Sequence, residues 1–502
     1  MQVYFNKNKI NKIFCNTNFS TIIKTFVNNF IKMKNKNLNI SLEGNILKGL
    51  FFLSLPILIG NFLQASYNFV DAYWIGKISK EAVASISASF PIIFFIVSLG
   101  TGFSMAGTIL IAQYAGAKNK EKLDKTASQT LTIDVFLAVF LGMIGYFSSE
   151  SILKLLKVND NVIIHALPYL KITFIGLVFS FIFSMFQSIM RGVGEVKLPM
   201  YIILATVILN FIIDPILILG FGPIPAMGVS GAAIATIIAQ FISAGVGVYI
   251  LFKGNHSVKV DFKNLIPKFS FIKKVFFLGL PSSIEMSIRS LGMVLLTGIV
   301  TYFGTVALAG FGAGGNIFQF IFIPTMGFSI AISTMVGQNI GAGNIKRASQ
   351  IAKTGTLITF VALEIIGLFI FIFAPFLIEL FVNDRETIKT GVDLMRISAF
   401  SFGIMGIQFA LTGVFRAAGN TSLAMILGIV SMFVVQLPIA FILSIHLNWG
   451  INGVWWSFTI VNIIMAIICV LIYLKGNWKN KKITAEEKKE IEIDKSVSTF
   501  KK

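Results

Sequence analysis

Long apolar runs, repeated along almost the whole chain, constrain its fold more than any other feature. From Leu50 onward, runs of roughly 20 residues alternate with short polar breaks, and each run is long enough to cross a bilayer as a helix. Of the 502 residues, 55% are hydrophobic and only 13% are charged, which excludes a soluble protein of this size. We therefore predict an all-α polytopic membrane protein with twelve transmembrane helices, at residues 50–76, 87–113, 131–148, 166–190, 198–220, 229–252, 274–300, 309–337, 354–375, 394–415, 423–445 and 450–474.

The basic residues of the connecting loops predict how these helices are oriented. Lys and Arg gather in the loops around 118–125, 253–274 and 346–347, whereas the intervening loops are neutral or acidic. Because cytoplasmic loops are rich in Lys and Arg, we place these three loops and both basic tails in the cytoplasm, with the plasma membrane as the expected location. The formal net charge of +20 then reflects topology, and no nucleic-acid partner is expected.

The same pattern divides the chain into five parts. We predict a basic cytoplasmic tail at 1–47, an N-terminal lobe of six helices at 48–252, a basic cytoplasmic linker at 253–273, a C-terminal lobe at 274–475 and a charged cytoplasmic tail at 476–502. Met33 opens a conventional short lead-in to the first span. Translation is therefore expected to begin there, which would make residues 1–32 an extension absent from the native protein.

Three short motifs of the first half recur in the second half. Each recurs 225 residues later: Leu55-Pro56 as Leu280-Pro281, Gln113 with Gly116 as Gln338 with Gly341, and Met190-Arg191-Gly192 as Phe415-Arg416-Ala417. A constant offset indicates that one six-helix unit has been duplicated in parallel topology. We therefore expect two lobes related by a pseudo-twofold axis along the membrane normal, with a cavity between them, as in a transporter.

An acidic residue lies inside the apolar run from 198 to 220. Asp214 follows Asn210 by four residues, so both side chains share one face of a helix, and Pro215 is expected to bend the helix beside the acid. A carboxylate inside a membrane is costly, which makes a functional role the default hypothesis. The alternative is an Asp that only forms hydrogen bonds between packed helices.

A second acid, Asp71, is expected at nearly the same depth in the first span. Gln64, Tyr67 and Asn68 precede it by seven, four and three residues and therefore share its helix face. Thr236, near the outer end of the sixth span, is expected to reach the same level. Two acids from one lobe at one depth predict one site, although a polar packing seam would show the same pattern.

The second half of the chain lacks this acidic pair. At the corresponding places, 225 residues later, it has only the apolar residues Leu296, Val435 and Ile439. Glu285 precedes Arg289 by four residues, which predicts an ion pair within one helix, with a direct role in transport as the alternative. Glu364 lies in the middle of a span without a partner that the sequence identifies.

Sequence motifs for nucleotide hydrolysis and metal binding are absent. The chain has no G-x-x-x-x-G-K-[ST] phosphate loop and no large soluble domain, so an ion gradient is expected to drive transport. The G-x-G-x-x-G at 310–315 opens a membrane span and is better explained by close helix packing. The three His residues are scattered and the two Cys residues suggest no disulfide, so we expect no cofactor and no enzyme activity.

Several of these motifs together resemble those of multidrug and toxic compound extrusion (MATE) transporters. The matching features follow one another over about residues 48–475: Pro56 with Asp71, Met190-Arg-Gly-Val-Gly194 with Pro199-Met200, Asn210-x-x-x-Asp214-Pro215, Gly228-x-x-Gly231-Ala-Ala-x-Ala-Thr236 and Val336-Gly-Gln-Asn-x-Gly-Ala-Gly343. Each motif is weak alone, and their order and spacing make the set fairly specific.

The resemblance implies a V-shaped, two-lobed antiporter that exports organic, often cationic, compounds in exchange for sodium ions or protons by alternating access. For the archaeal-like and DinF-like branch, it implies a cation site for Na+ or H+ at Asp71, Asn210, Asp214 and Thr236. The polar neighbours that it implies are Gln64, Tyr67, Asn68 and Gln187. Members with a C-lobe site have an acid further along the seventh span than Glu285 and another in the tenth span, whose core has no acid here.

Two other functions stay open at this point. A lipid-linked oligosaccharide flippase of the same superfamily would need a cationic cavity, for which Arg289 and Arg396 are the mid-span candidates. A membrane channel or receptor would not need duplicated lobes with acids in only one of them. We favour the antiporter, working as a monomer in the lipid bilayer on small organic, cationic substrates.

Overall fold

The computed structural model describes residues 41–480 and, among these, every side chain except those of Asn68 and Phe69. Helices make up most of this part of the chain, which contains no β-strand and only one isolated bridge, between Phe221 and Ile224. The predictions for residues 1–32, and for the tail from residue 481 onward, lie outside the described residues.

Each half of the chain forms a series of long helices. The N-terminal half contains α4 (Ile46–Ile75), α5 (Lys80–Gly116), α6 (Lys120–Leu155), α7 (Asp160–Gly192), α8 (Lys197–Leu219) and α9 (Gly228–Lys253). The C-terminal half contains α10 (Phe269–Thr301), α11 (Thr305–Gly341), α12 (Ile345–Glu379), α13 (Arg385–Ala399), α14 (Phe402–Ala417), α15 (Thr421–Ile429), α16 (Leu437–Phe441) and α17 (Ile451–Lys475). The π-helical stretch Val430–Gln436 joins α15 to α16, and a second one, Ile442–His446, continues α16, so that Thr421–His446 forms one continuous span.

Most helices are longer than the apolar runs that predicted them. The third one, predicted at 131–148, extends over Lys120–Leu155. Helix starts lie in polar sequence because capping side chains set them: Ser79, Asn119 and Asn344 each accept a hydrogen bond from a backbone N–H of the first turn, at 3.0 to 3.2 Å. The apolar run marks the hydrocarbon core of the membrane, whereas the caps mark the ends of the helix.

The tenth predicted span is not one straight helix. It is divided into α13 and α14, which are bent by 55° relative to each other, so the expectation of a continuous helix over 394–415 was wrong. Distant side chains satisfy polar groups at this break: Glu364 accepts a hydrogen bond from the N–H of Gly403 at 3.1 Å, and Asn462 donates to the Ser401 hydroxyl at 2.9 Å. Irregular backbone at membrane depth is tolerated where such partners exist. With the eleven other apolar helices, this pair completes the twelve predicted spans.

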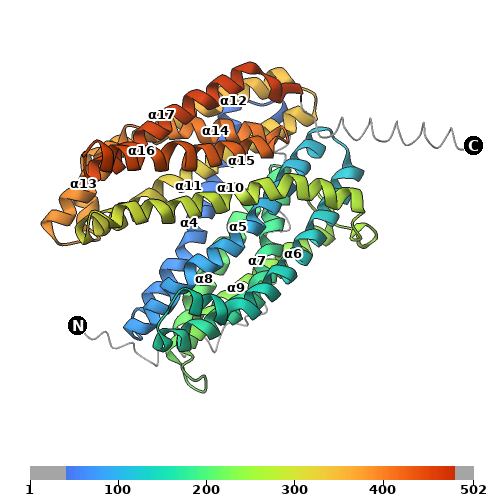
Figure 1. Cartoon of the computed structure of the whole chain (residues 1–502). Coiled ribbons are helices and arrows are strands. Elements are labelled where there is room, and N and C mark those ends of the chain that lie inside the picture. Colours follow the sequence, from blue (N-terminus) through green and yellow to red (C-terminus); the bar gives the residue numbers. More distant parts are fainter. Residues whose placement is uncertain (1–40, 481–502) are drawn as a thin grey trace, which may run out of the picture.

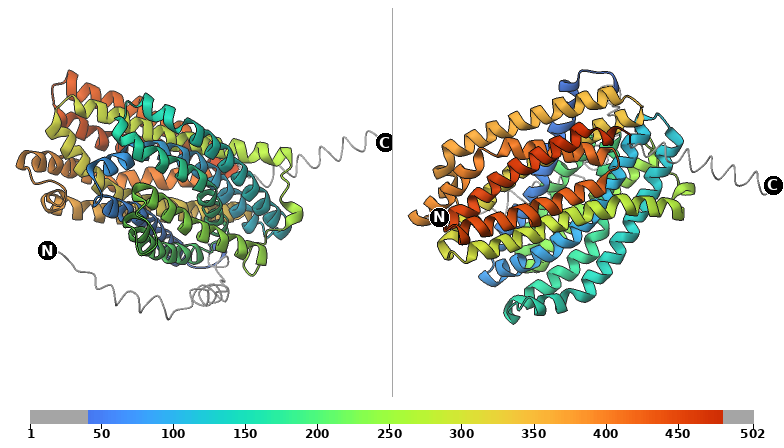
Figure 2. Two further views of the ribbon diagram at one scale, coloured as in Figure 1. Left: turned by 90° about the horizontal axis from the view of Figure 1, so that it is seen from below. Right: turned by 45° about the horizontal axis from the view of Figure 1, so that its top comes forward.

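The helices form two lobes that diverge from a common end, which makes the molecule V-shaped as predicted (Figure 1). Helices α4 to α9, coloured blue to green, form one lobe, and α10 to α17, coloured yellow-green to red, form the other. Within the first lobe α7 packs against α5, α6 and α9, and within the second α14 packs against α11, α12 and α17. The right-hand view of Figure 2 shows the same pair of bundles after a turn of the molecule.

Many large apolar side chains point away from both lobes. Phe147 is 79% exposed, and Phe136, Ile175 and Ile365 are each more than 60% exposed. Apolar surface of this extent is unstable in water, and a surrounding layer of lipid chains removes it from water. The outer surface therefore supports the lipid bilayer as the environment of the protein.

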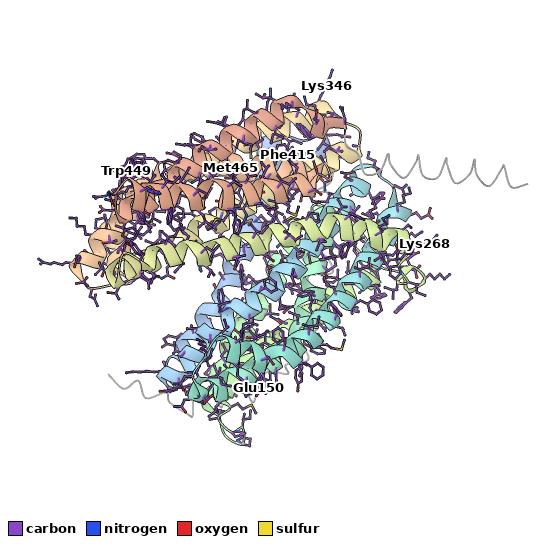
Figure 3. All side chains as sticks on the ribbon, in the orientation of Figure 1. Glu150, Lys268, Lys346, Phe415, Trp449 and Met465 are labelled. Carbon is purple, nitrogen blue, oxygen red and sulfur yellow. The ribbon has the colours of Figure 1, made fainter. Side chains whose placement is uncertain are left out.

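The two lobes meet at the end of the molecule that carries the basic loops, which we call the basic end. Figure 3 labels Lys268 and Lys346 toward this end, and Glu150 and Trp449 toward the opposite one. Helix α5 packs against α10 and α11, and α4 packs against α11. The place where the lobes meet is called the vertex below.

Two equivalent hydrogen bonds connect the lobes at the vertex. The side-chain amide of Gln113 donates to the carbonyl oxygen of Ala417, and that of Gln338 donates to the carbonyl oxygen of Gly192, both at 2.8 Å. Donors and acceptors are each 225 residues apart, so the bonds follow the symmetry of the motif repeat. The motif singled out in the sequence therefore lies at the contact between the lobes.

Candidate functional site

The four residues predicted for the cation site come together between α4, α8 and α9, and we call them the acid cluster. The hydroxyl of Thr236 donates to Oδ2 of Asp71 at 3.3 Å, and the amide of Asn210 donates to Oδ1 of Asp214 at 2.9 Å. Asp71 is 8% exposed, and Asn210 and Asp214 are completely buried. The side chains of Asp71 and Asp214 are close enough to hydrogen-bond each other, which joins the two pairs into one cluster.

The spacing of residues on α8 explains the hydrogen bond between Asn210 and Asp214. Asn210 lies one helical turn before Asp214, so its amide reaches the carboxylate without any bend in the backbone. The helix continues past Pro215 and ends at Leu219. The expected bend at Pro215 stays a prediction.

Three buried oxygen atoms of the acid cluster have no hydrogen-bond donor. They are Oδ1 of Asp71, Oδ1 of Asn210 and Oδ2 of Asp214. Buried polar atoms are normally paired, because an unpaired one loses its hydration without compensation. A proton or a small cation that prefers oxygen ligands would compensate for these missing donors.

The electrostatics of the acid cluster favour the same conclusion. Neither acid forms an ion pair with Lys, Arg or His within the part of the chain that the structure describes. Two ionised carboxylates in contact, away from water, repel each other strongly. Residues 41–480 also contain no group of three His, Cys, Asp or Glu side chains arranged to hold a metal. A proton or a small cation between the two acids would relieve this repulsion.

Tyrosine and hydroxyl side chains surround the acids. Tyr67 is 7% exposed and lies beside Thr206, whose Oγ1 accepts a hydrogen bond from the hydroxyl of Ser243 at 3.1 Å. Tyr169 of α7 lies near both acids and was missed from the sequence, because a single Tyr in an apolar helix is unremarkable. These groups complete a polar pocket inside the N-terminal lobe.

The other predicted polar neighbours are not brought into the acid cluster. Gln64 is exposed on α4, and the side chain of Asn68 lies outside the described residues. Gln187 accepts a hydrogen bond from Arg191 at 2.7 Å, eighteen residues along α7 from Tyr169. At a rise of about 1.5 Å per residue this is about 27 Å, so Gln187 belongs to the vertex.

In the second lobe, Glu285 lies between two arginines. Its Oε1 is 3.3 Å from Arg289 and 3.5 Å from Arg416, and the carboxylate is 3% exposed. The guanidinium of Arg289 also lies over the ring of Phe409, 4.6 Å from its centroid. Glu285 is thus a shared counter-ion, and the pair expected within one helix includes a third residue that the sequence did not indicate.

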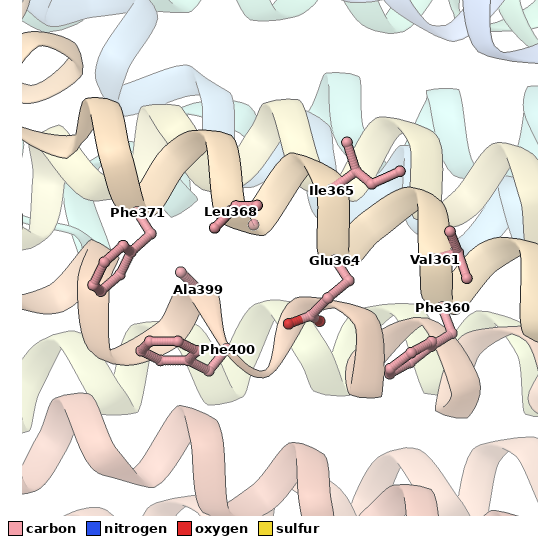
Figure 4. A pocket seen from close by; sticks show the side chains of 9 residues that line it. Phe360, Val361, Glu364, Ile365, Leu368, Phe371, Ala399 and Phe400 are labelled. Carbon is pink, nitrogen blue, oxygen red and sulfur yellow. The ribbon is translucent and has the colours of Figure 1, made fainter.

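Glu364 has a partner that its sequence neighbourhood did not reveal. It points from α12 toward the break between α13 and α14 and caps the N-terminus of α14 through Gly403 (Figure 4). The surrounding hollow of about 370 Å³ is lined by apolar side chains such as Ile365 and Phe400, which are 64% and 60% exposed. This position on the outer face of the lobe explains Glu364 as a structural cap.

Sequence analysis missed three charged residues inside helices. Asp134 of α6 is completely buried and neither of its oxygens has a hydrogen-bond donor. Arg191 and Arg416 line a small cavity between the lobes, although each lies one residue beyond its predicted span. Their place in the repeated motif was the available signal. Arg396, proposed for a cationic cavity, is instead exposed over the ring of Phe371.

Comparison with known proteins identifies the family. The MatE family model matches residues 56–216 and 281–442, with one match in each lobe. The probable multidrug resistance protein YpnP of Bacillus subtilis (strain 168) is 30% identical over 446 residues, which cover 89% of this chain and 98% of the relative. The probable multidrug resistance protein NorM of Thermotoga maritima is 29% identical over 448 residues, covering 88% of this chain and 95% of the relative.

Solved structures share the fold. A crystal structure of MATE in the straight conformation is 24% identical, with a TM-score of 0.82, and the match covers 91% of this chain and 100% of that chain. A MOP superfamily transporter from Pyrococcus furiosus is also 24% identical, with a TM-score of 0.84 over 90% of this chain and 100% of that chain. Family matches in both lobes, relatives aligned along almost the whole chain and the shared fold show that this chain belongs to the multidrug and toxic compound extrusion (MATE) family, whose members are transporters and not enzymes.

Proposed function

We propose that this protein is a secondary active antiporter that exports small organic compounds with a cationic group in exchange for a sodium ion or a proton. Relatives named as multidrug resistance and multidrug export proteins support efflux as its function. We place it in the plasma membrane as a monomer with both termini in the cytoplasm, because both tails are basic.

One observation supports the acid cluster as the coupling site. Asp71, Asn210 and Asp214 hold three buried oxygens that lack donors, and the two acids lie in mutual contact. A proton shared by the carboxylates, or a sodium ion held by these oxygens with the hydroxyl of Thr236, would satisfy all of them at once.

The packing of α4 gives the cluster a connection to the other lobe. Asp71 lies in the second half of α4, which packs against α8, whereas Leu50, Leu53 and Ile57 of the first half lie in a hydrophobic core with residues of α11 and α14. A cation that neutralises the cluster changes the environment of Asp71, and α4 carries that change to the second lobe. Its release restores a negative site that attracts the cationic group of the next substrate.

The test is efflux from reconstituted vesicles in which sodium and pH gradients are imposed separately. Ethidium and norfloxacin serve as substrates, and wild-type protein should export them under one of the two gradients. Asp214→Asn should abolish this gradient dependence, because the isosteric amide cannot bind the cation as a carboxylate does.

Asp134→Asn is the matched control. It makes the same substitution at a completely buried acid of the same lobe, on a helix that does not contribute to the acid cluster. Gradient-driven efflux at the wild-type rate by Asp214→Asn would remove the cluster from the mechanism. An equal loss of efflux in both variants would show that replacing any buried acid of this lobe impairs the protein, so the loss would not indicate coupling.

A further inference from the structure

A small cavity lies between the two lobes at the vertex. Its volume is about 70 Å³, and it is lined by α5 and α7 of one lobe and by α11 and α14 of the other. Most of the lining side chains carry a hydroxyl group: Thr101, Ser104, Thr108, Ser184, Ser188, Ser329 and Ser333. A hydroxyl-rich cavity at membrane depth is suited to a polar group rather than to an alkyl chain.

Two arginines at equivalent positions face this cavity from opposite lobes. Arg191 donates to the neutral amide oxygen of Gln187 at 2.7 Å and stays partly exposed. Arg416 is 4% exposed, lies 3.2 Å from the sulfur of Met105, and its Nε has no hydrogen-bond acceptor. Each guanidinium group thus has N–H groups that do not donate to a carboxylate of the same helix.

The charges around the cavity do not balance. Arg191, Arg289 and Arg416 provide three positive charges, and Glu285 is the acid that lies beside two of them. Helices α11 and α14 contain no acidic residue, and the acids of α5 and α7 lie in their first turns, at the opposite end of each helix. Buried cations without counter-ions are costly, so the vertex favours an anion as its ligand.

We propose that the vertex cavity binds an oxyanion, a carboxylate or a phosphate group, between Arg191 of one lobe and Arg416 of the other. Guanidinium groups bind such anions through paired, charge-assisted hydrogen bonds. Thr101, Thr108, Ser184 and Ser329 already donate their hydroxyl hydrogens within the protein, which leaves those of Ser104, Ser188 and Ser333 to donate to the anion. The proposal rests on the proposed function in one respect: the oxyanion is part of the exported compound. The substrates then include zwitterions, which carry such an oxyanion in addition to their cationic group.

The position of the cavity connects this ligand to the contact between the lobes. Arg191 precedes Gly192, and Arg416 precedes Ala417, whose carbonyl oxygens accept the two hydrogen bonds from Gln338 and Gln113. An oxyanion that contacts both arginines therefore holds together the same backbone segments that the glutamines connect. Binding of an acidic substrate should favour the conformation that is closed at the vertex.

The experiment measures ligand binding to the purified full-length protein in detergent, without an ion gradient. Norfloxacin carries a carboxylate and an amine, whereas ethidium is a cation without an acidic group, and both are fluorescent. Arg191→Gln and Arg416→Gln should each weaken norfloxacin binding by at least about tenfold, the loss expected for a charge-assisted hydrogen bond. Ethidium binding should change by less than about twofold, and Arg191→Lys should keep part of the norfloxacin affinity.

Two controls separate the oxyanion site from other causes. Arg396→Gln removes one positive charge from an exposed position of the second lobe and should leave both affinities unchanged. Inorganic phosphate should compete with norfloxacin, but not with ethidium, on the wild-type protein, which needs no variant and therefore no assumption about folding.

Equal weakening of both drugs in variants with unchanged melting temperature would overturn the proposal, as would absence of phosphate competition. Because no gradient is applied, failure of ion coupling at the acid cluster leaves this result unaffected. Conversely, Asp214→Asn tests coupling without altering either arginine, so the two proposals fail independently.

Discussion

At the scale of single residues, Asp71 and Asp214 belong to one site. Thr236 binds one acid and Asn210 binds the other, and the two carboxylates interact directly. The three oxygens without donors, one each on Asp71, Asn210 and Asp214, lie in one pocket, so a single cation would contact both acids. If the acid cluster binds the coupling ion as proposed, removal of either acid should abolish the same binding event.

The first prediction follows from this shared site. Asp71→Asn and Asp214→Asn should each reduce gradient-driven efflux by more than about tenfold, and the double variant should be little worse, because residues that act as a unit are non-additive. Initial rates of ethidium efflux from vesicles at matched protein content measure this. Losses that multiply in the double variant would indicate two separate sites.

The residues also show which parts of the site the sequence could predict. Asp71, Asp214 and Thr236 were predicted to meet because their depths could be read from the positions of their spans. Arg191 and Arg416 could not be placed in the interior, because each lies at the end of an apolar run where a basic residue normally contacts lipid headgroups. Only the packing of the two lobes brings these chain segments together.

At the scale of elements, apolar runs predicted the number of spans, whereas hydrogen bonds between distant segments decided their shape. The break between α13 and α14 depends on Glu364 of α12 and Asn462 of α17, which are remote from it in sequence. A Cβ at Gly403 would collide with the carboxylate of Glu364 and lie 2.8 Å from the carbonyl oxygen of Phe360. Local sequence therefore carried little information about this bend.

The second prediction concerns this break. Gly403→Ala should lower the melting temperature of the protein, with a loss of about 1 to 3 kcal/mol of stability, because the added methyl group overpacks a buried backbone contact. Thermal unfolding of the purified protein measures the effect. Gly315→Ala on α11 is the matched control, since a Cβ there meets nothing within 4 Å. A destabilisation of equal size in both variants would contradict this account of the break.

Glu195, a buried acid outside the membrane spans, binds the segment that connects the two lobes. Glu195 lies 2.6 Å from Nδ1 of His256, and its other oxygen accepts hydrogen bonds from the N–H and hydroxyl of Ser257, at 3.2 and 2.7 Å. Burial alone would raise the pKa of Glu195, but the hydrogen bond and charge of His256, with the bonds from Ser257, hold its pKa below the ordinary value.

The third prediction is a pH dependence of this attachment. A lowered pKa contributes stability that is fully present above the ordinary value for Glu, about 4.3, and is lost as the pH falls through the lowered pKa. Glu195→Gln should therefore lower the melting temperature by a constant amount from pH 7 down to about pH 4.3, and the difference from wild type should shrink as the pH falls below that value. Glu121→Gln, an exposed acid of α6 near the same end, is the control. A difference that stays unchanged as the pH falls well below about 4.3 would exclude an ionised Glu195 as the cause.

At the scale of the whole molecule, the 225-residue repeat predicted the two lobes, and the same repeat supplies the contact between them. Gly116 and Gly341 occur in the repeated motif because a Cβ at either position would overlap the backbone of Gln338 or Gln113 on the facing helix. The sequence showed that these positions correspond, whereas their contact could not be predicted, because it depends on how two separately folded lobes come together.

The last prediction tests whether this symmetric contact controls opening of the vertex. Each glutamine donates one buried hydrogen bond across the lobes, and such a bond contributes about 0.5 to 1.5 kcal/mol, so losing both should favour the open vertex by about 5- to 150-fold.

In a background without Cys15 and Cys469, a single cysteine introduced by Ser188→Cys in the cavity reports this opening. It should be alkylated faster from the basic end in the Gln113→Ala/Gln338→Ala variant. The two single variants should lie between wild type and the double variant, and be similar to each other because the bonds are equivalent. Gln319→Ala, an exposed glutamine of α11, should leave the rate unchanged. Alkylation at the wild-type rate in the double variant would show that apolar packing, rather than these hydrogen bonds, keeps the lobes together.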